Sequence, residues 1–386
     1  RHDEGYRAAL ARLKAARVAE NRFVNDIPEI MVMREMKQRR PTRLLKRGAY
    51  DAPGEPVEPG TPDSILPFPS DLPRNRLGLA KWMLDRRNPL VARVAANRVW
   101  KMHFGRGLVG TVHDFGSQGQ LPSHPELLDW LARWFMDHGW DRKALHRLIV
   151  TSATYRQSSR ADRELMARDP ENRLLARGPK HRLDAEQIRD QALAVAGLLD
   201  ERIGGPSAKP YQPAGLWEES GTGKTYQQDK GRGLYRRSLY TFWRRTAPPP
   251  SMLTFDATSR EVCTAKRETT TTPLQALVLL NDPQFVEAAR VLAETLLRHH
   301  PASVEARLTA ACRALIGRPP TQPESRVLRR LFEEQWAYFA GDPGRAEKFL
   351  AVGEKARDPA LPAPELAATT VLASTLMNHD DFVMKR

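Results

Sequence analysis

Apolar residues recur at helical spacing along most of the chain from residue 77 onward. Residues three or four positions apart lie on one face of a helix, so these stripes predict amphipathic helices. The clearest stripes are Leu77, Leu79, Ala80, Met83 and Leu84; Leu90, Val91, Val94, Ala95 and Val99; Leu127, Leu128, Leu131, Trp134 and Phe135; Leu145, Leu148 and Ile149; and Ile188, Ala192, Val195 and Leu199. We expect further helices over residues 4–19 and 364–377. The pattern predicts a mainly α fold, an irregular multi-helix domain.

Residues that cap helix starts stand directly before several of these stripes. Ser123, Asp184, Thr272 and Thr321 are each followed three residues later by Glu or Gln, which is the capping-box pattern. Asp282 stands before a proline and predicts a further helix start. We therefore expect helix in more than roughly 45% of the residues and strand in less than roughly 12%, against typical fractions of about one third and one quarter.

Two short segments have strand character instead. Residues 27–36 (IPEIMVMREM) and 236–243 (RRSLYTFW) are rich in β-branched and aromatic residues. Pairing between them would give a small β element. Residues 52–73 contain seven prolines, which indicates an extended linker. These features predict an N-terminal part over residues 1–62 and a helical domain over residues 63–386.

The charge of the chain is strongly positive. Its 386 residues carry a net charge of +15, and basic residues cluster over residues 34–47 and 224–245. Such clusters attract polyanions, although an arginine-rich surface facing solvent gives the same pattern. Aromatic residues lie among the second cluster, as in proteins that bind sugars or nucleic acids, and equally as in loops that aromatic side chains anchor. No apolar stretch approaches the roughly 20 residues of a membrane span.

The two cysteines, Cys263 and Cys312, permit one disulfide without requiring it. Cys312 lies in an apolar stripe and is expected to be a buried small side chain. No CxxCH motif is present, so no c-type haem is expected on this chain and no other cofactor is predicted. Because the chain begins at Arg1 without a signal peptide, we expect it to be a piece of a longer protein.

A polar loop before Thr272 is the first candidate binding site. Asp256, Arg260, Lys266 and Arg267 lie close to a predicted helix N-terminus, where basic side chains and free N–H groups suit an anion or a carboxylate. The alternative is an ion-paired loop in which Asp256 and a nearby glutamate neutralise the cations. We expect Asp256 to hold Arg260 or Arg267.

A second candidate is a group of acid–base side chains over residues 103–126. His103, Asp114, His124 and Glu126 could form a catalytic cluster, with His113 between them. The alternative is structural, since Glu126 also completes the predicted capping box. The spacing does not favour a metal site.

Two other motifs do not meet the requirements of a site. Residues 221–225 (GTGKT) lack the first glycine of a phosphate-binding loop and the strand before it, so we expect no nucleotide there. His146 and Ser152 share a predicted helix, but the chain has no nucleophile elbow of the GxSxG kind.

Several long motifs resemble a known family. They include NRVWKMHFGRGLVGTVHDFGSQGQLPSHPELLDW at 97–130 and FDATSREVCTAKRETTTTPLQALVLLNDPQFVEAA at 255–289, together with GWDRKALHRLIVTSATYRQS and RLDAEQIRDQALAVAGLL. They are similar to the planctomycete-type domain of unknown function 1553, or PSD domain, over residues 73–386. Residues 28–62 resemble the tail of the domain that usually precedes it, so residues 1–62 would be a remnant of that domain plus the linker.

This resemblance implies a context rather than a reaction. It implies an exported protein, periplasmic or at the cell surface, that works with a cytochrome c module in cis or in trans, so any haem would lie on a separate module. It also implies a link to complex carbohydrate. We expect either a binding or assembly module for an acidic polysaccharide or a partner protein, or a saccharide-acting hydrolase or lyase that uses the His/carboxylate cluster. A specific nucleic-acid role is not expected, because no zinc-finger or RNP motif is present.

Overall fold

The computed structural model describes residues 3–219, 221 and 223–385. Helices make up 49% of it, and only two small antiparallel two-stranded sheets accompany them, so the predicted mainly α fold is confirmed. Thr222, in the segment we expect not to bind nucleotide, lies outside the described residues. The chain divides into two compact units, one up to Val91 and one from Ala92 onward. Residues 63–91, placed with the second domain by the sequence pattern, thus lie in the first unit.

The first unit contains few elements. They are α1 (Glu4–Asn25), β1 (Thr42–Leu45), the 3-10 turn η1 (Lys46–Gly48), β2 (Pro53–Val57) and α2 (Arg76–Met83). β1 and β2 pair antiparallel with Thr42 opposite Val57. The strand predicted over residues 27–36 is wrong: the segment is extended, fully exposed and pairs with no strand. Its apolar composition favours a strand, but a strand needs a partner edge, and none lies beside it.

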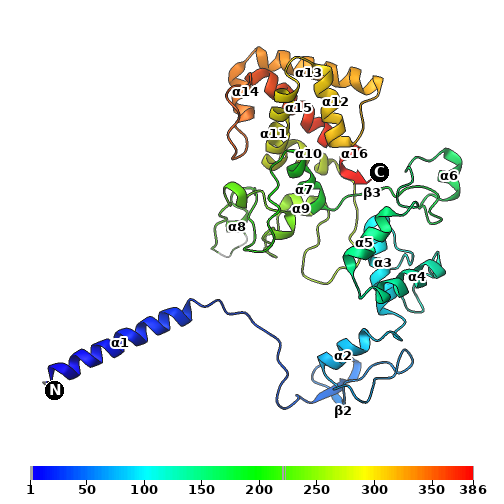
Figure 1. The fold of residues 1–386 in the computed structure, drawn as a ribbon, viewed down its shortest axis with the longest axis vertical. Coiled ribbons are helices and arrows are strands. Elements are labelled where there is room, and N and C mark those ends of the chain that lie inside the picture. Colours follow the sequence, from blue (N-terminus) through cyan, green and yellow to red (C-terminus); the bar gives the residue numbers. More distant parts are fainter. Residues whose placement is uncertain (1–2, 220, 222, 386) are drawn as a thin grey trace. The chain divides into compact units, whose positions relative to one another are not determined.

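The second unit holds the remaining elements (Figure 1). Its elements up to α9 are α3 (Val91–Phe104), α4 (Pro125–Asp137), α5 (Arg142–Thr151), α6 (Arg163–Arg168), β3 (His181–Arg182), α7 (Ala185–Val195), α8 (Leu216–Glu219), η2 (Gly231–Gly233), η3 (Ser238–Tyr240) and α9 (Pro250–Thr254). Those that follow are α10 (Pro273–Asn281), α11 (Pro283–His299), α12 (Val304–Ile316), α13 (Gln322–Ala340), α14 (Pro343–Leu350), α15 (Ala363–Met377), α16 (Asp380–Val383) and β4 (Met384–Lys385). No helix among the described residues has both the length and the apolar character needed to cross a membrane.

The largest core of this unit surrounds α11 and α15, which lie side by side (Figure 1). Both helices are buried along most of their length. Apolar or small residues occupy nearly every face of α15, whereas α11 also buries the charged side chains of Glu287, Arg290 and Glu294. α7, α10, α12, α13 and α14 cover them. Cys312 is one of the fully buried residues of this core, as predicted.

A second core joins α3, α4 and α5. Trp100 and Phe104 stack with ring centroids 4.1 Å apart on α3, and Leu131 and Leu145 pack against them from the other two helices. Burying such aromatic and aliphatic side chains contributes about 1.5–3 kcal/mol each. This core fixes the end of α3, which forms one wall of the pocket described below.

A short sheet connects distant parts of the chain beside this core. β3 pairs antiparallel with β4, so that His181 lies opposite Lys385 and Arg182 opposite Met384. The backbone N–H of Leu183 extends the ladder by donating to Val383 at 2.9 Å. The C-terminal end of the described chain thereby holds the segment that carries His181.

Four of the five predicted helix starts are confirmed, and the one at Ser123 is wrong. Capping boxes at Asp184, Thr272 and Thr321 are confirmed, and Asp282 caps α11. The box at Ser123 is wrong, because α4 begins one residue later than predicted and its N-cap position is His124. Ser123 instead donates through both its N–H and its hydroxyl to the Leu108 carbonyl, at 2.9 and 3.3 Å.

The strand predicted over residues 236–243 is also wrong. The segment forms the 3-10 turn η3 and two isolated bridges, Asp200 with Arg236 and Ala208 with Thr241. Its backbone is used to hold the long loop after α7, since the Ala208 N–H donates to Tyr240 and Ala208 accepts from Phe242, both at 2.7 Å. These contacts leave no continuous edge for a strand partner.

Candidate functional site

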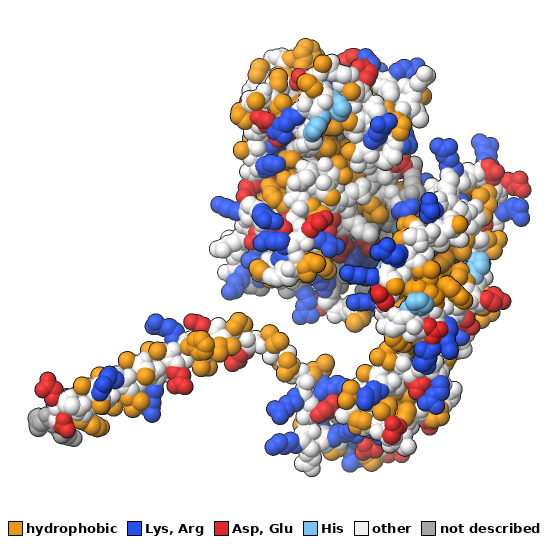
Figure 2. Space-filling view, viewed as in Figure 1, with side chains coloured by type: hydrophobic (Ala, Val, Ile, Leu, Met, Phe, Trp, Pro, Cys, Tyr) orange, Lys and Arg blue, Asp and Glu red, His pale blue; other side chains and the backbone are white. Residues whose placement is uncertain are grey.

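A pocket of about 630 Å³ in the second unit brings basic side chains together from four segments of the chain. We call it the basic pocket. Its charged and titratable lining residues are Lys101, Arg106, His113, Glu171, Arg173, Lys180, His181 and Lys266. Five of these are lysine or arginine and one is acidic. Basic side chains are visible over the whole face shown in Figure 2, in keeping with the net charge of +15. The pocket is therefore a concentrated part of a generally basic surface.

The wall of the pocket is a glycine-rich turn after α3, held by one buried amide. Asn97 is fully buried on α3, accepts from the Val109 N–H at 2.9 Å and donates to the Val109 carbonyl at 3.0 Å. Gly107 passes so close to this amide that a Cβ there would lie 2.7 Å from Nδ2. These contacts fix the turn from Gly105 to Val109 against the helix, so the pocket wall is rigid.

His181 forms the opposite side of the pocket. Gly105 has a φ of +75°, and a Cβ there would stand 2.9 Å from the Cβ of His181, so the imidazole packs directly on the bare backbone. Its Nδ1 is buried with no hydrogen-bond partner among the described residues. Nε2 is therefore the ring nitrogen that can meet a ligand in the pocket.

The charge state of His181 follows from its surroundings. Burial lowers the pKa of His181, and the neighbouring Lys385 and Lys101 lower it further, while Asp184 acts in the opposite sense. Burial also lowers the pKa of Lys101, although Asp184 opposes that shift as well. The His181 imidazole is therefore neutral at neutral pH, and Lys101 loses its proton more readily than an exposed lysine does.

The acidic lining residue does not neutralise the pocket. Glu171 forms an ion pair with Arg106, whose other guanidinium nitrogen lies 3.3 Å from the Gln120 amide oxygen. The ammonium groups of Lys180 and Lys266 have no hydrogen bond or ion pair in the part of the chain that the structure describes. Both cations are exposed and face the same pocket, so they repel each other until an anion compensates them.

The candidate binding loop contributes only Lys266 to this pocket. Arg267 forms a bidentate ion pair with Glu186, with hydrogen bonds of 2.6 and 3.0 Å, and lies 3.8 Å from the Asp184 carboxylate. Arg260 lies over the Trp243 ring, 4.7 Å from its centroid.

Asp256 holds neither of these arginines. Its carboxylate accepts from the N–H and hydroxyl of Thr270, both at 2.9 Å, and pairs with Arg182. The prediction that Asp256 holds Arg260 or Arg267 at the start of α10 is therefore wrong. The physical reason is that the start of α10 is already occupied by its own capping box, whereas the start of α7 offers carboxylates to Arg267.

The four predicted catalytic residues do not meet. His103 Nε2 lies 2.7 Å from His146 Nδ1, Asp114 accepts from the Gly116 N–H at 2.7 Å, and His124 Nδ1 lies 3.0 Å from the Ser123 hydroxyl. Glu126 is exposed in the first turn of α4. None of the four lines the basic pocket, whereas their sequence neighbour His113 does.

Sequence reasoning missed the residues that matter most for the pocket, Lys101, Lys180 and His181. One signal was present: Arg177, Lys180, His181 and Arg182 form a basic run directly before the capped start of α7. Among the described residues, no three His, Cys, Asp or Glu side chains are placed to hold a metal ion.

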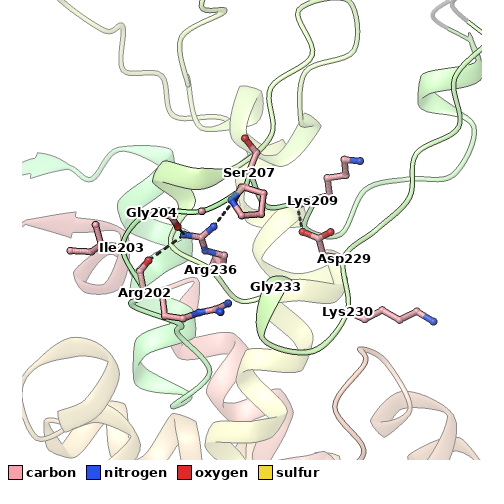
Figure 3. Close-up of a pocket in the computed structure, with 11 residues that line it drawn as sticks. Arg202, Ile203, Gly204, Ser207, Lys209, Asp229, Lys230, Gly233 and Arg236 are labelled. Atoms are coloured by element: carbon pink, nitrogen blue, oxygen red, sulfur yellow. Dashed lines mark hydrogen bonds between the residues drawn. The ribbon is translucent and has the colours of Figure 1, made fainter. Parts of the chain in front are cut away.

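A second pocket, shown in Figure 3, is also basic but is built differently. Arg236 lies at its centre and donates to the carbonyl groups of Arg202, Gly204 and Pro206. Its guanidinium also covers the Tyr240 ring at 3.8 Å. Lys209 and Lys230 point away from the centre in the figure. This arginine serves to hold the loop, so the pocket is a weaker candidate for a ligand.

The comparisons with known proteins place the chain in a family without assigning it a reaction. The family model PSD1, described as a protein of unknown function (DUF1553), matches residues 75–332. No curated protein matches the chain, and no solved structure does. The matched range covers α3, the glycine-rich turn, β3 and the loop that carries Lys266, and thus all lining residues of the basic pocket. The chain belongs to the PSD1 (DUF1553) family.

Proposed function

We propose that the second unit is a binding module that takes an acidic carbohydrate into the basic pocket. The observation that carries this proposal is the unbalanced charge of the lining. Five lysine and arginine side chains line the pocket with one carboxylate, and that carboxylate already forms an ion pair with Arg106. Carboxylate or sulfate groups on a sugar chain would supply the missing negative charge.

The shape and rigidity of the pocket support the same proposal. Its volume of about 630 Å³ lies within the range of ~300–1,000 Å³ that is common for small-ligand pockets. Asn97 fixes one wall, and the β3–β4 pairing fixes the other, so little conformational entropy would be lost on binding.

The family resemblance supplies the wider context of the proposal. This resemblance implies that the module belongs to an exported protein, periplasmic or at the cell surface. It also implies that the module works beside a cytochrome c module and acts in the metabolism of complex carbohydrate. The chain has no CxxCH motif, so any haem would be bound by a separate module. The basic module would then hold an acidic polysaccharide close to the redox module.

Calorimetry with defined oligosaccharides tests the binding. We expect oligogalacturonate or a chondroitin sulfate oligosaccharide to bind, a neutral cello-oligosaccharide not to bind, and the affinity to fall as salt is raised. A contact between unit charges in water is worth about 1 kcal/mol, so Lys180→Ala and Lys266→Ala should each weaken binding about fivefold.

Lys348→Ala is the matched control, since this lysine is exposed on α14 and lies outside the pocket. Its affinity should equal that of the wild type. Equal binding of neutral and acidic oligosaccharides, or an unchanged affinity in the Lys180→Ala, Lys266→Ala double variant, would contradict the proposal.

A further inference from the structure

The basic pocket contains the parts of a proton-transfer site as well as those of an anion site. His181 presents one accessible ring nitrogen to the pocket, because its other nitrogen is buried. Lys101 lines the same pocket one helical turn before Gly105, the residue on which the imidazole packs. A proton acceptor and a proton donor therefore face one ligand space.

The surroundings suit these two roles. Burial and the cations of Lys101 and Lys385 keep the pKa of His181 below its ordinary value, so its imidazole is neutral at neutral pH and can accept a proton. Burial lowers the pKa of Lys101, which makes its ammonium a stronger acid than that of an exposed lysine.

The lining also bears on the type of reaction. Hydrolysis of a glycoside commonly uses two carboxyl groups on opposite sides of the scissile bond. The basic pocket has Glu171 alone, and Arg106 holds it. Elimination needs different groups: cations that neutralise a carboxylate on the sugar, a neutral base, and an acid for the leaving oxygen. The pocket provides each of these.

We infer that the basic pocket is the active site of a lyase that cleaves uronate-containing polysaccharide by β-elimination, with His181 as the base and Lys101 as the acid. This inference rests on the proposed binding function and adds a reaction to it. Lys180 and Lys266 would neutralise the uronate carboxylate, which makes the hydrogen on the adjacent ring carbon more acidic.

The steps balance without any oxidant or other reactant. His181 Nε2 takes the proton from the carbon that bears the carboxylate, and the C–H electron pair forms a double bond to the next ring carbon. The bond from that carbon to the glycosidic oxygen breaks, and the oxygen keeps its electron pair and takes a proton from Lys101. The protonated His181 and neutral Lys101 then exchange protons with solvent and are restored.

The experiment combines binding and product formation on the same full chain. Oligomers of galacturonate, glucuronate and mannuronate are offered, binding is followed by calorimetry, and the unsaturated uronide is followed by ultraviolet absorbance and mass spectrometry. We expect at least one oligomer to be bound and cleaved. His181→Asn and Lys101→Met should each reduce the rate at least roughly a hundredfold, which is the usual contribution of a general acid or base.

His299→Gln is the control, because His299 is exposed at the end of α11 and lies outside the basic pocket. It should keep the wild-type rate, and circular dichroism should show that all three variants are folded. The rate should rise with pH through the titration of His181 and fall again as Lys101 loses its proton. Asp184 and Lys385 act on His181, and Asp184, Lys266 and Arg267 act on Lys101, so these charges set the pH values at which the rate rises and falls.

The outcomes separate the two proposals. Failure of the wild type to bind any acidic oligomer would overturn the binding function and the lyase together. Binding without an unsaturated product would overturn the lyase alone. Cleavage that survives His181→Asn or is abolished by His299→Gln would overturn the assignment of the base.

Discussion

Gly105 and His181 approach each other so closely that a single methyl group on the glycine would lie 2.9 Å from the Cβ of the histidine. The glycine directly follows α3, and the histidine lies on β3, 76 positions later in the sequence. Their contact closes the basic pocket, so the pocket depends on a residue without a side chain.

Gly105→Ala should therefore lower both stability and ligand binding. The substitution puts a side chain on a φ of +75° and against the imidazole, and we expect a loss of about 2–4 kcal/mol in the free energy of unfolding. Gly139→Ala is the control, since Gly139 has a φ of +64° but no atom within 4 Å of its added Cβ. It should cost only about 1–2 kcal/mol, from the backbone alone. Equal losses in urea unfolding would show that the contact with His181 is unimportant.

The local features of the fold were predictable from the sequence. Capping boxes at Asp184, Thr272 and Thr321 form between residues three positions apart, so both partners can be identified from the local sequence. Ser123 shows the limit of this reasoning. It has the same local pattern, but its N–H and its hydroxyl both donate hydrogen bonds to the carbonyl of Leu108, 15 positions away.

The pocket was much less predictable, because it is made by long-range contacts. Of the eight residues assigned to candidate sites, only Lys266 lines it. The position of His181 depends on pairing between β3 and β4, which are two residues long and about 200 positions apart. Strands this short leave no periodic pattern in a sequence, so periodicity could not have revealed the pair.

The ion pair between Arg267 and Glu186 should contribute to stability rather than to binding. Both side chains are largely buried, with 30% and 26% exposed, and the guanidinium makes two hydrogen bonds. We expect Arg267→Ala to cost about 1–3 kcal/mol, between the values for exposed and fully buried pairs. Arg330→Ala, which removes a fully exposed pair with Glu334, should leave the free energy of unfolding nearly unchanged, because solvent screens that pair.

Urea unfolding of both variants checks this prediction, together with the affinity for oligogalacturonate. A stable Arg267→Ala variant that no longer binds the oligosaccharide would contradict it. Such a result would assign Arg267 to the ligand, as the sequence first indicated.

The contact between His103 and His146 predicts a loss of stability in mild acid. Their ring nitrogens lie 2.7 Å apart, so one ring must accept a hydrogen bond from the N–H of the other. Burial lowers the pKa of His103 below its ordinary value of 6.5, and His146 and His181 add to the shift. Because the folded pKa is below the unfolded one, the unfolded chain binds the proton first. The stabilising contribution is therefore full above pH 6.5 and is lost as the pH falls below it.

Unfolding measured from pH 8 to about pH 5 tests this dependence. His103→Gln should flatten the part of the curve below neutral pH, whereas His299→Gln, at an exposed site at the end of α11, should leave it unchanged. Identical curves for the wild type and His103→Gln would contradict the prediction.

Glu287 should be among the most sensitive positions of the larger core. Its carboxylate is fully buried on α11, accepts from the hydroxyls of Tyr211 and Tyr235 at 2.9 Å each, and accepts from the Lys355 N–H at 2.7 Å. Burial raises the pKa of both tyrosines, and the carboxylate raises it further, so both hydroxyls remain donors. Glu287→Gln puts an amide donor against these donors and removes the charge beside Arg290. We expect a loss of about 2–4 kcal/mol.

Tyr235→Phe provides the comparison, because it removes one donor and leaves the carboxylate with its other two. It should cost about 1 kcal/mol, the usual net value of a single hydrogen bond. The two variants are compared by urea unfolding at neutral pH. If Glu287→Gln cost no more than Tyr235→Phe, the carboxylate would contribute only one ordinary hydrogen bond. A larger loss means that the carboxylate, which accepts from all three donors beside Arg290, holds the loops of Tyr211 and Lys355 on α11, since only the first variant replaces it.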